Sequence, residues 1–160
     1  MTAATTTPLP PCDLAIIGGG AGGVLSALQA LRLATTPLRI VMIEPRKVLA
    51  QGVAYATTYG EHVLNVPAAR MSAFDDRPAD FLDYVVATAP SDGPDRDTLA
   101  HAFIERRRYG DYLRTRLQAM GLAVQAASFD AEGQTGENLF ADVSGKADAP
   151  LLLIGAHSDR

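Results

Sequence analysis

The chain has 160 residues, of which 48% are hydrophobic and 20% charged, and its formal net charge is −4. These values predict one ordinary soluble domain and argue against nucleic-acid binding. No apolar run reaches membrane-spanning length, which argues against a membrane protein, and three scattered histidines do not indicate a metal site. The single cysteine, Cys12, cannot form an internal disulfide, so we expect a reducing, cytoplasmic location.

Residues 1–11 lack the basic region and apolar core of a signal peptide, so we expect them to form a disordered tail. Residues 12–157 are expected to form a single domain. It begins with an apolar strand over about 12–18, which runs into a glycine-rich turn. Apolar residues then recur at helical spacing and predict a helix over about 21–34.

The turn between this strand and helix has the spacing Gly-x-Gly-x-x-Gly, which is typical of dinucleotide-binding βαβ units. Gly18 allows the tight turn, Gly20 lets a pyrophosphate approach the backbone, and Gly23 lets the helix pack against the strand. The N–H groups at the start of the helix would face the phosphates. We therefore predict that a dinucleotide cofactor binds at Gly18, Gly20, Gly22 and Gly23.

A second apolar strand is predicted over about 38–44, and Glu44 stands at its end. A carboxylate at this distance after the glycines accepts hydrogen bonds from the adenosine ribose hydroxyls. Strand, glycine turn, helix, strand and acid together predict a dinucleotide site. The alternative is a glycine-rich turn in an unrelated α/β fold.

Residues 45–76 show no sustained period, and a loop of that length inside a domain is usually functional. Asp75, Asp76 and Pro78 then indicate the start of a helix. The apolar residues that follow predict that this helix extends to about Ala87.

Residues 89–97 are predicted to form an exposed linker, because they combine prolines, a glycine and aspartates. Residues 98–120 have a helical pattern with a candidate break at Gly110. We expect the next strand of the sheet over 122–127 and a small β excursion within 128–146.

The last apolar run, over 151–154, ends at Gly155. Four strands with helices between them predict an α/β fold, a Rossmann-like doubly wound parallel sheet with the small β excursion before its last strand. Ligands of such sheets bind at the carboxyl ends of the strands. Gly18, Glu44 and Gly155 are all expected at that edge.

Three further motifs occur along the chain. Residues 51–55 read QGVAY, residues 62–72 read HVLNVPAARMS, and residues 106–113 read RRRYGDYL. With the glycine turn and Glu44, they resemble the bacterial FAD/NAD(P)-binding family that includes FAD-dependent urate hydroxylases and aspartate N-monooxygenases. The resemblance extends over about 13–155.

In that family the first dinucleotide-binding domain holds FAD, and NAD(P)H reduces the flavin. The resemblance implies that the glycine turn holds the FAD pyrophosphate. It also implies that a loop along the flavin includes Gln51, Gly52, Asn65 and Met71. The alternative for Asn65 is a residue that caps its own turn. Gly155 stands in Leu153-Ile154-Gly155, where such flavoproteins often carry Ala-Thr-Gly.

Other residues of these motifs have more than one interpretation. The arginines of 106–108 either contact a phosphate or form a solvated face. Tyr109 and Tyr112 are expected in the core with their hydroxyls at the rim. His157 is the only histidine expected near the cofactor edge, and no residue is indicated as catalytic.

The sequence thus predicts the FAD-binding domain of a flavin-dependent oxidoreductase or monooxygenase. No second Gly-x-Gly-x-x-Gly follows Gly23, and the resembled enzymes are longer, so we expect a domain truncated at its C-terminus. A partner chain would then complete the flavin site. The alternatives are a non-catalytic or degenerate nucleotide-binding module and a single-domain NAD-binding reductase. A bound flavin, which is yellow, distinguishes the first hypothesis from the last.

Overall fold

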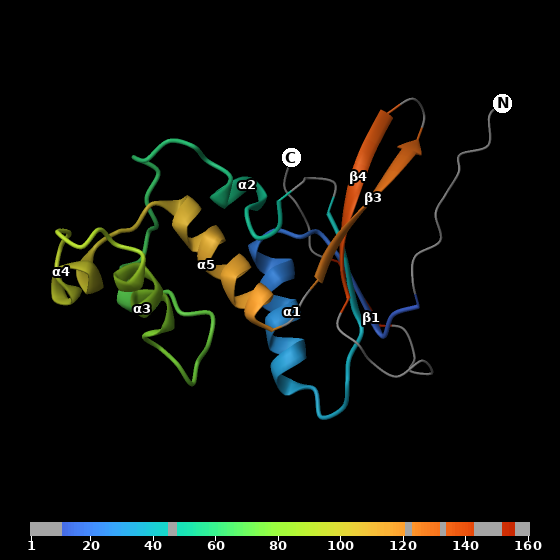
Figure 1. The fold of residues 1–160 in the computed structure, drawn as a ribbon, viewed down its shortest axis with the longest axis horizontal. Coiled ribbons are helices and arrows are strands. Elements are labelled where there is room, and N and C mark those ends of the chain that lie inside the picture. Colours follow the sequence, from blue (N-terminus) through green and yellow to red (C-terminus); the bar gives the residue numbers. More distant parts are fainter. Residues whose placement is uncertain (1–10, 45–47, 121–122, 132–133, 143–151, 156–160) are drawn as a thin grey trace.

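Short parallel strands lie beside a group of helices in the computed structural model of the protein (Figure 1). The structure describes residues 11–44, 48–120, 123–131, 134–142 and 152–155. In chain order its elements are β1 (Leu14–Ile17), α1 (Ala21–Leu33), β2 (Ile40–Ile43), α2 (Gly52–Tyr55), the 3-10 helix η1 (Ala68–Arg70), α3 (Asp80–Ala87), α4 (Arg96–His101), α5 (Arg106–Ala119), β3 (Ala123–Ala131), β4 (Gln134–Asp142) and β5 (Leu152–Gly155).

The described strands form a parallel sheet in the order β2-β1-β5. Ile17, the last residue of β1, pairs with Ile43 on one side and with Gly155 on the other. Leu14, Ala15 and Ile16 are all buried, as expected for a central parallel strand whose two faces are covered. The strands predicted around 12–18, 38–44 and 151–154 are thereby confirmed.

The strand predicted over 122–127 is real, but its predicted place in the parallel sheet is wrong. β3 pairs antiparallel with β4, from Ala123 opposite Asp142 to Ala131 opposite Gln134, in a separate two-stranded sheet. An alternating sequence does not specify which strand it pairs with, and here the neighbour in sequence is the partner. The β excursion before the last strand is thus confirmed, but it begins earlier than expected.

The described helices lie on one side of the parallel sheet, the side of α1 (Figure 1). Contacts between β4 and β2 join the hairpin to the sheet. The mixed α/β architecture with a parallel sheet is therefore as predicted. Helices on both faces, which a doubly wound sheet requires, are not seen among the described residues.

Helix α1 packs against α5, which separates it from α3. The buried residues of α1 recur along one stripe, and α5 does the same with Tyr109, Tyr112, Leu113 and Leu117. This spacing gives both helices an apolar stripe toward the core, and the arginines of α5, which are good helix formers, also favour the helix.

The helical pattern of 98–120 is interrupted before Glu105, so the candidate break at Gly110 is wrong. α4 begins after Asp95, whose side chain accepts a hydrogen bond from the Thr98 amide at 2.8 Å. Residues 102–105 are extended instead of helical because their backbone pairs with residues 63–68. The Leu64 amide, for example, donates to the Ile104 carbonyl at 2.8 Å.

The expected long loop over 45–76 contains the short helices α2 and η1 within its described part. The predicted helix start at Asp75 and Asp76 is wrong. Helix α3 begins at Asp80 without a side-chain cap, and Asp76 instead forms an ion pair with Arg32 of α1 at 2.6 Å. The predicted end of that helix at Ala87 is confirmed.

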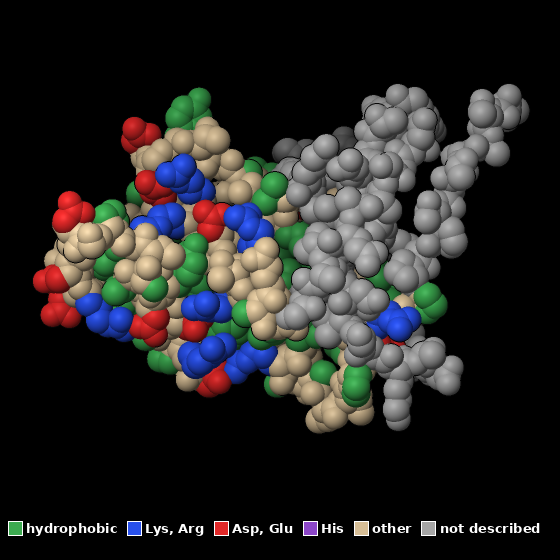
Figure 2. Space-filling view, viewed as in Figure 1, with side chains coloured by type: hydrophobic (Ala, Val, Ile, Leu, Met, Phe, Trp, Pro, Cys, Tyr) green, Lys and Arg blue, Asp and Glu red, His purple; other side chains and the backbone are tan. Residues whose placement is uncertain are grey.

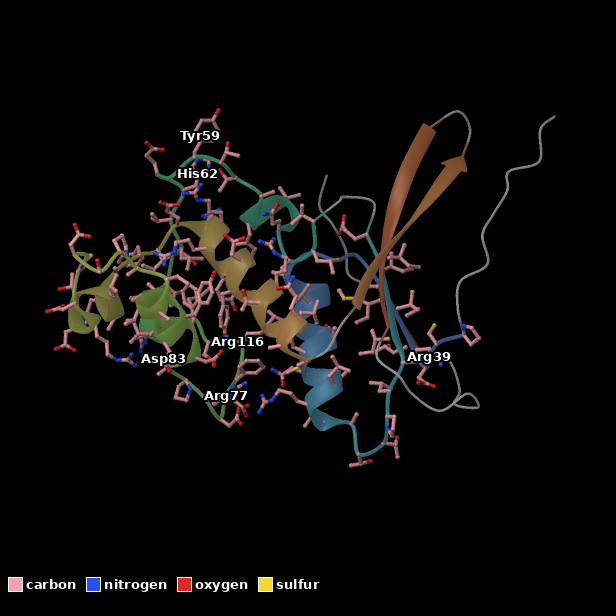
Figure 3. All side chains as sticks on the ribbon, in the orientation of Figure 1. Arg39, Tyr59, His62, Arg77, Asp83 and Arg116 are labelled. Carbon is pink, nitrogen blue, oxygen red and sulfur yellow. The ribbon has the colours of Figure 1, made fainter. Side chains whose placement is uncertain are left out.

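A buried polar network joins α3, α5 and the segment before α3. The Tyr112 hydroxyl donates to Asp80 at 2.8 Å and accepts from the Ala73 amide at 3.1 Å. Arg116 Nε donates to the same Asp80 oxygen at 2.7 Å, and Figure 3 shows Arg116 and Arg77 in this region. Tyr112 is fully buried, so the expectation of a hydroxyl at the rim is wrong for it.

Candidate functional site

The glycine turn follows directly from the end of β1. Gly18 has a φ of +98°, a left-handed conformation that favours glycine, and its amide donates to the Ile43 carbonyl at 2.8 Å. An ideal Cβ on Gly23 would overlap the carbonyl oxygen of Gly18. The first helix can therefore pack this closely on the strand only because residue 23 is a glycine.

The N-terminus of α1 is open to an anion. Gly20 is its N-cap and supplies no side-chain acceptor, and the first turn contains no acidic residue. Gly22 is exposed, and a Cβ there would meet nothing within 4 Å. The free N–H groups and the helix dipole of a 13-residue helix favour a phosphate at such a position.

Glu44 lies beside this turn, at the end of β2. Its side chain is buried, and its Oε2 atom accepts a hydrogen bond from the Gly19 amide at 2.7 Å. The carboxylate is therefore held at the sheet edge by the backbone of the turn itself.

Gly19 is a residue of the turn that the spacing argument did not single out. An ideal Cβ on Gly19 would overlap Leu49 and would lie 2.8 Å from the Cβ of Glu44. A glycine is thus needed for Glu44 to approach the turn. The sequence did contain a signal for this role. The Gly-x-Gly spacing allows any residue at the middle position, and here that position is also a glycine.

The segment 50–52 closes against the other side of the turn. The Ala50 amide donates to the Gly19 carbonyl at 2.7 Å, and an ideal Cβ on Gly20 would lie 3.4 Å from the Cα of Gly52. Gly52 has a φ of +50°, and Ala50 has a φ of +69° although it is not a glycine. The tertiary structure thus brings Gln51 and Gly52 to the glycine turn.

Of the remaining predicted site residues in the described part of the chain, Gly155 lies near the glycine turn, whereas no hydrogen bond joins Asn65 or Met71 to it. Gly155 pairs with Ile17, so it lies at the same sheet edge as Gly18 and Glu44. Asn65 is exposed in the chain between α2 and η1, and Met71 is half-buried against the core. Within the described residues, no hydrogen bond joins either of these two to the glycine turn. His157 lies outside the described residues.

The arginines of 106–108 are engaged within the protein. Arg106 Nε donates to the Val63 carbonyl at 2.9 Å, and Arg107 pairs with Glu105 at 2.6 Å. Arg108 donates to Thr88 Oγ1 at 2.7 Å. These bonds tie α5 to its surroundings, so the geometry does not support a phosphate contact. On the face seen in Figure 2, basic and acidic side chains are interspersed over the helices.

His62 is held in an outer loop, away from α1 (Figure 3). Its Nδ1 atom lies 2.7 Å from Thr57 Oγ1, and its ring lies 5.4 Å from that of Tyr59. These contacts stabilise the loop and place the imidazole outside the candidate site.

A cleft of about 650 Å³ lies at the opposite end of α1 from the glycine turn. Gln29 and Arg32 line it from the helix, and Ser72 and Phe74 line it from the segment before α3. Arg32 is paired with Asp76, and Gln29 donates to the Ala73 carbonyl at 2.7 Å. The polar groups of this cleft therefore stabilise the fold, and the cleft is separate from the candidate dinucleotide site.

The described residues contain no cluster of histidine, cysteine and acidic side chains that could hold a metal ion. None of their helices has the length and apolar character needed to cross a membrane.

The sequence model of one protein family, described as FAD-NAD(P)-binding, matches residues 15–135, which is more than half of the chain. The match includes residues 15–17 of β1, the glycine turn, Glu44 and the 50–52 segment. Comparisons with curated proteins and with solved structures found no match.

Proposed function

The chain belongs to the FAD-NAD(P)-binding family, and from this premise we propose that it is the FAD-binding domain of a flavin-dependent oxidoreductase or monooxygenase. The proposal takes residues 12–157 as one domain with a reducing, cytoplasmic location. Membership of this family indicates that the ligand is a flavin or nicotinamide dinucleotide. The choice of FAD is supported by the resemblance to the urate hydroxylase and aspartate N-monooxygenase type.

One observation carries the proposal, which is the open N-terminus of α1 between Glu44 and Gly52. The glycines leave the first-turn N–H groups accessible, as the pyrophosphate requires. Glu44 lies on one side of the turn, where the adenosine ribose would be bound. These residues fit the adenosine diphosphate half of FAD.

In this arrangement the protein binds and orients the cofactor. Gly20 and Ala21 would hold the pyrophosphate through their backbone, and Gln51 and Gly52 would cover it from the opposite side. Gly155, at the end of β5, would lie along the same edge. When bound, FAD supplies the redox chemistry, and NAD(P)H is the proposed reductant.

The test of this proposal is a titration of the whole chain with FAD, NAD and NADP by calorimetry, for the parent and for Gly20→Val. Valine would place methyl groups against Gly52 and over the pyrophosphate position, so we expect FAD binding to be lost while the fold is kept. Gly60→Ala is the matched control, since a Cβ there would make only ordinary contacts with Glu105 in an exposed loop. Equal FAD affinity in parent and Gly20→Val would contradict the proposal.

The same titration tests the role of Glu44 in nucleotide selection. A carboxylate favours free ribose hydroxyls and repels a 2′-phosphate. We therefore expect the parent to prefer NAD over NADP, and Glu44→Gln to reduce that preference about tenfold, a typical size for one charged contact. The amide can still accept the hydrogen bond from Gly19, so the turn is kept. An unchanged preference in Glu44→Gln would rule out this role.

A further inference from the structure

Gly110 occupies an unusual position, the interior of α5. It is buried, and α5 continues without interruption from Arg106 to Ala119. A glycine inside a helix destabilises it relative to alanine, since the glycine backbone loses more freedom on folding. Its presence at a buried helical position therefore indicates a packing constraint.

The neighbours of Gly110 identify that constraint. An ideal Cβ on this residue would lie 3.2 Å from the Ala50 carbonyl oxygen, 3.4 Å from the Cβ of Tyr55 and 3.5 Å from the Cγ of Gln51. All three belong to the segment 50–55. A second contact joins the same parts of the chain, because the rings of Tyr55 and Tyr109 lie 5.3 Å apart. Helix α5 thus packs directly on this segment.

The opposite side of the segment faces the glycine turn. Ala50 donates to the Gly19 carbonyl at 2.7 Å, and Gly52 contacts the backbone at Gly20. Ala50 is fully buried with a φ of +69°. A non-glycine residue keeps this backbone conformation only where its surroundings impose it. The segment is therefore held between two backbones, that of α5 and that of the turn.

We propose that α5, through Gly110, positions segment 50–52 on the glycine turn and thereby sets the affinity of the turn for the dinucleotide pyrophosphate. Gly110 is a positioning residue, since it contacts the segment and not the ligand. A Cβ at this residue forces the Ala50 carbonyl to move by a few tenths of an ångström, and the bond from the Ala50 amide to Gly19 transmits the movement to the turn. The ligand part of this inference rests on the proposed function.

The experiment compares Gly110→Ala with the parent and with Thr115→Ala, all as the whole chain. Thr115 is exposed on the same helix, so its replacement by alanine raises helix propensity without adding a contact to the segment. Hydrogen exchange of the Ala50 amide is measured without ligand, and FAD affinity is measured by calorimetry. For Gly110→Ala we expect faster exchange at Ala50 and FAD affinity about tenfold lower, a common size for coupling between a site and a packed neighbour.

The melting temperature separates positioning from simple destabilisation. We expect Gly110→Ala to melt close to the parent, because the gain in helix propensity offsets the tighter contact. Tyr55→Ala is the second variant, and it loosens the segment by removing the ring contact with Tyr109. It should also accelerate exchange at Ala50.

The outcomes distinguish the two proposals. The positioning role is overturned if the Ala50 amide exchanges at the rate of the parent in both Gly110→Ala and Tyr55→Ala. An unchanged FAD affinity in Gly110→Ala also overturns it. Should the parent bind neither FAD nor a nicotinamide dinucleotide, the proposed function fails, and the exchange data alone decide whether α5 positions the segment.

Discussion

The glycine turn and the α3–α5 region reach close packing by opposite means. At the turn, Gly23 lies against the Gly18 backbone and Gly19 lies against the side chains of Leu49 and Glu44, so neither position has room for a Cβ. Between α3 and α5, packing depends on large side chains, with Phe81 in ring contact with both Tyr109 and Tyr112. Gly19 and Gly23 therefore cannot accept an added Cβ, whereas the packing between α3 and α5 depends on keeping its large rings.

Among the substitutions considered, we expect Gly23→Ala to lower the free energy of unfolding the most. Its Cβ would overlap the Gly18 carbonyl oxygen, so α1 must move away from β1. We expect a loss of about 3 kcal/mol in the free energy of unfolding, at the upper end for overpacking of a rigid contact. Urea denaturation measures it.

Gly22→Ala is the matched control for this change in stability. It adds the same methyl group one residue earlier in α1, where a Cβ meets nothing within 4 Å. We expect its free energy of unfolding to equal or exceed that of the parent, because alanine favours the helix. Equal losses in Gly22→Ala and Gly23→Ala would mean that backbone contact does not limit packing at the turn.

A smaller loss is expected from Tyr112→Phe, in which only an oxygen atom is removed. Asp80 would lose a donor and the Ala73 amide would lose its acceptor, both in buried surroundings. We expect a destabilisation of about 2 kcal/mol, since unsatisfied buried polar groups cost about that much. Tyr84→Phe is the control, because Tyr84 is only half-buried and also contacts Phe81. Equal stability of Tyr112→Phe and the parent would show that the ring alone matters.

The third prediction concerns alkaline pH. Burial raises the pKa of the Tyr112 phenol to about 12, and burial, with the neighbouring Tyr112 and Tyr55, raises that of Tyr109. The folded state therefore favours the neutral phenols. Their contribution to stability is complete below the unfolded pKa of about 10 and is lost as the pH rises through the folded values.

Denaturation midpoints between pH 8 and 12 measure this loss. Tyr112→Phe should show a shallower decline than the parent, with a remaining decline from Tyr109. A decline of the same slope in both proteins would assign the alkaline effect to other groups. The glycine turn is made of backbone, so it is not expected to contribute to this pH dependence.

The sequence was a good guide where one physical constraint acts on neighbouring residues. The tight turn at Gly18 and the close helix packing at Gly23 both need glycine within a few positions, so a short pattern identifies them. The strands β1 and β2 were predicted for a similar reason, since buried parallel strands are continuously apolar. The roles of these residues toward a cofactor remain predictions.

Partners distant in sequence could not be predicted in this way. The pairing of β3 with β4, the extended residues 102–105 and the bond from Tyr112 to Asp80 each depend on a neighbour supplied by the fold. Gly110 illustrates the same limit. The sequence suggested a helix break, whereas in the tertiary structure it is the point where α5 approaches segment 50–55.

By itself, the sequence determined the βαβ unit, its glycine turn and the acid at the end of β2, because local backbone geometry and burial dictate these residue types. The tertiary structure decided which loop covers the turn. Segment 50–52 is held there by hydrogen bonding to Gly19 and by the backbone of α5, some sixty residues further along the chain. Contacts of this kind depend on the folded positions of both partners. Neither stretch of sequence contains a local pattern from which its partner could be predicted.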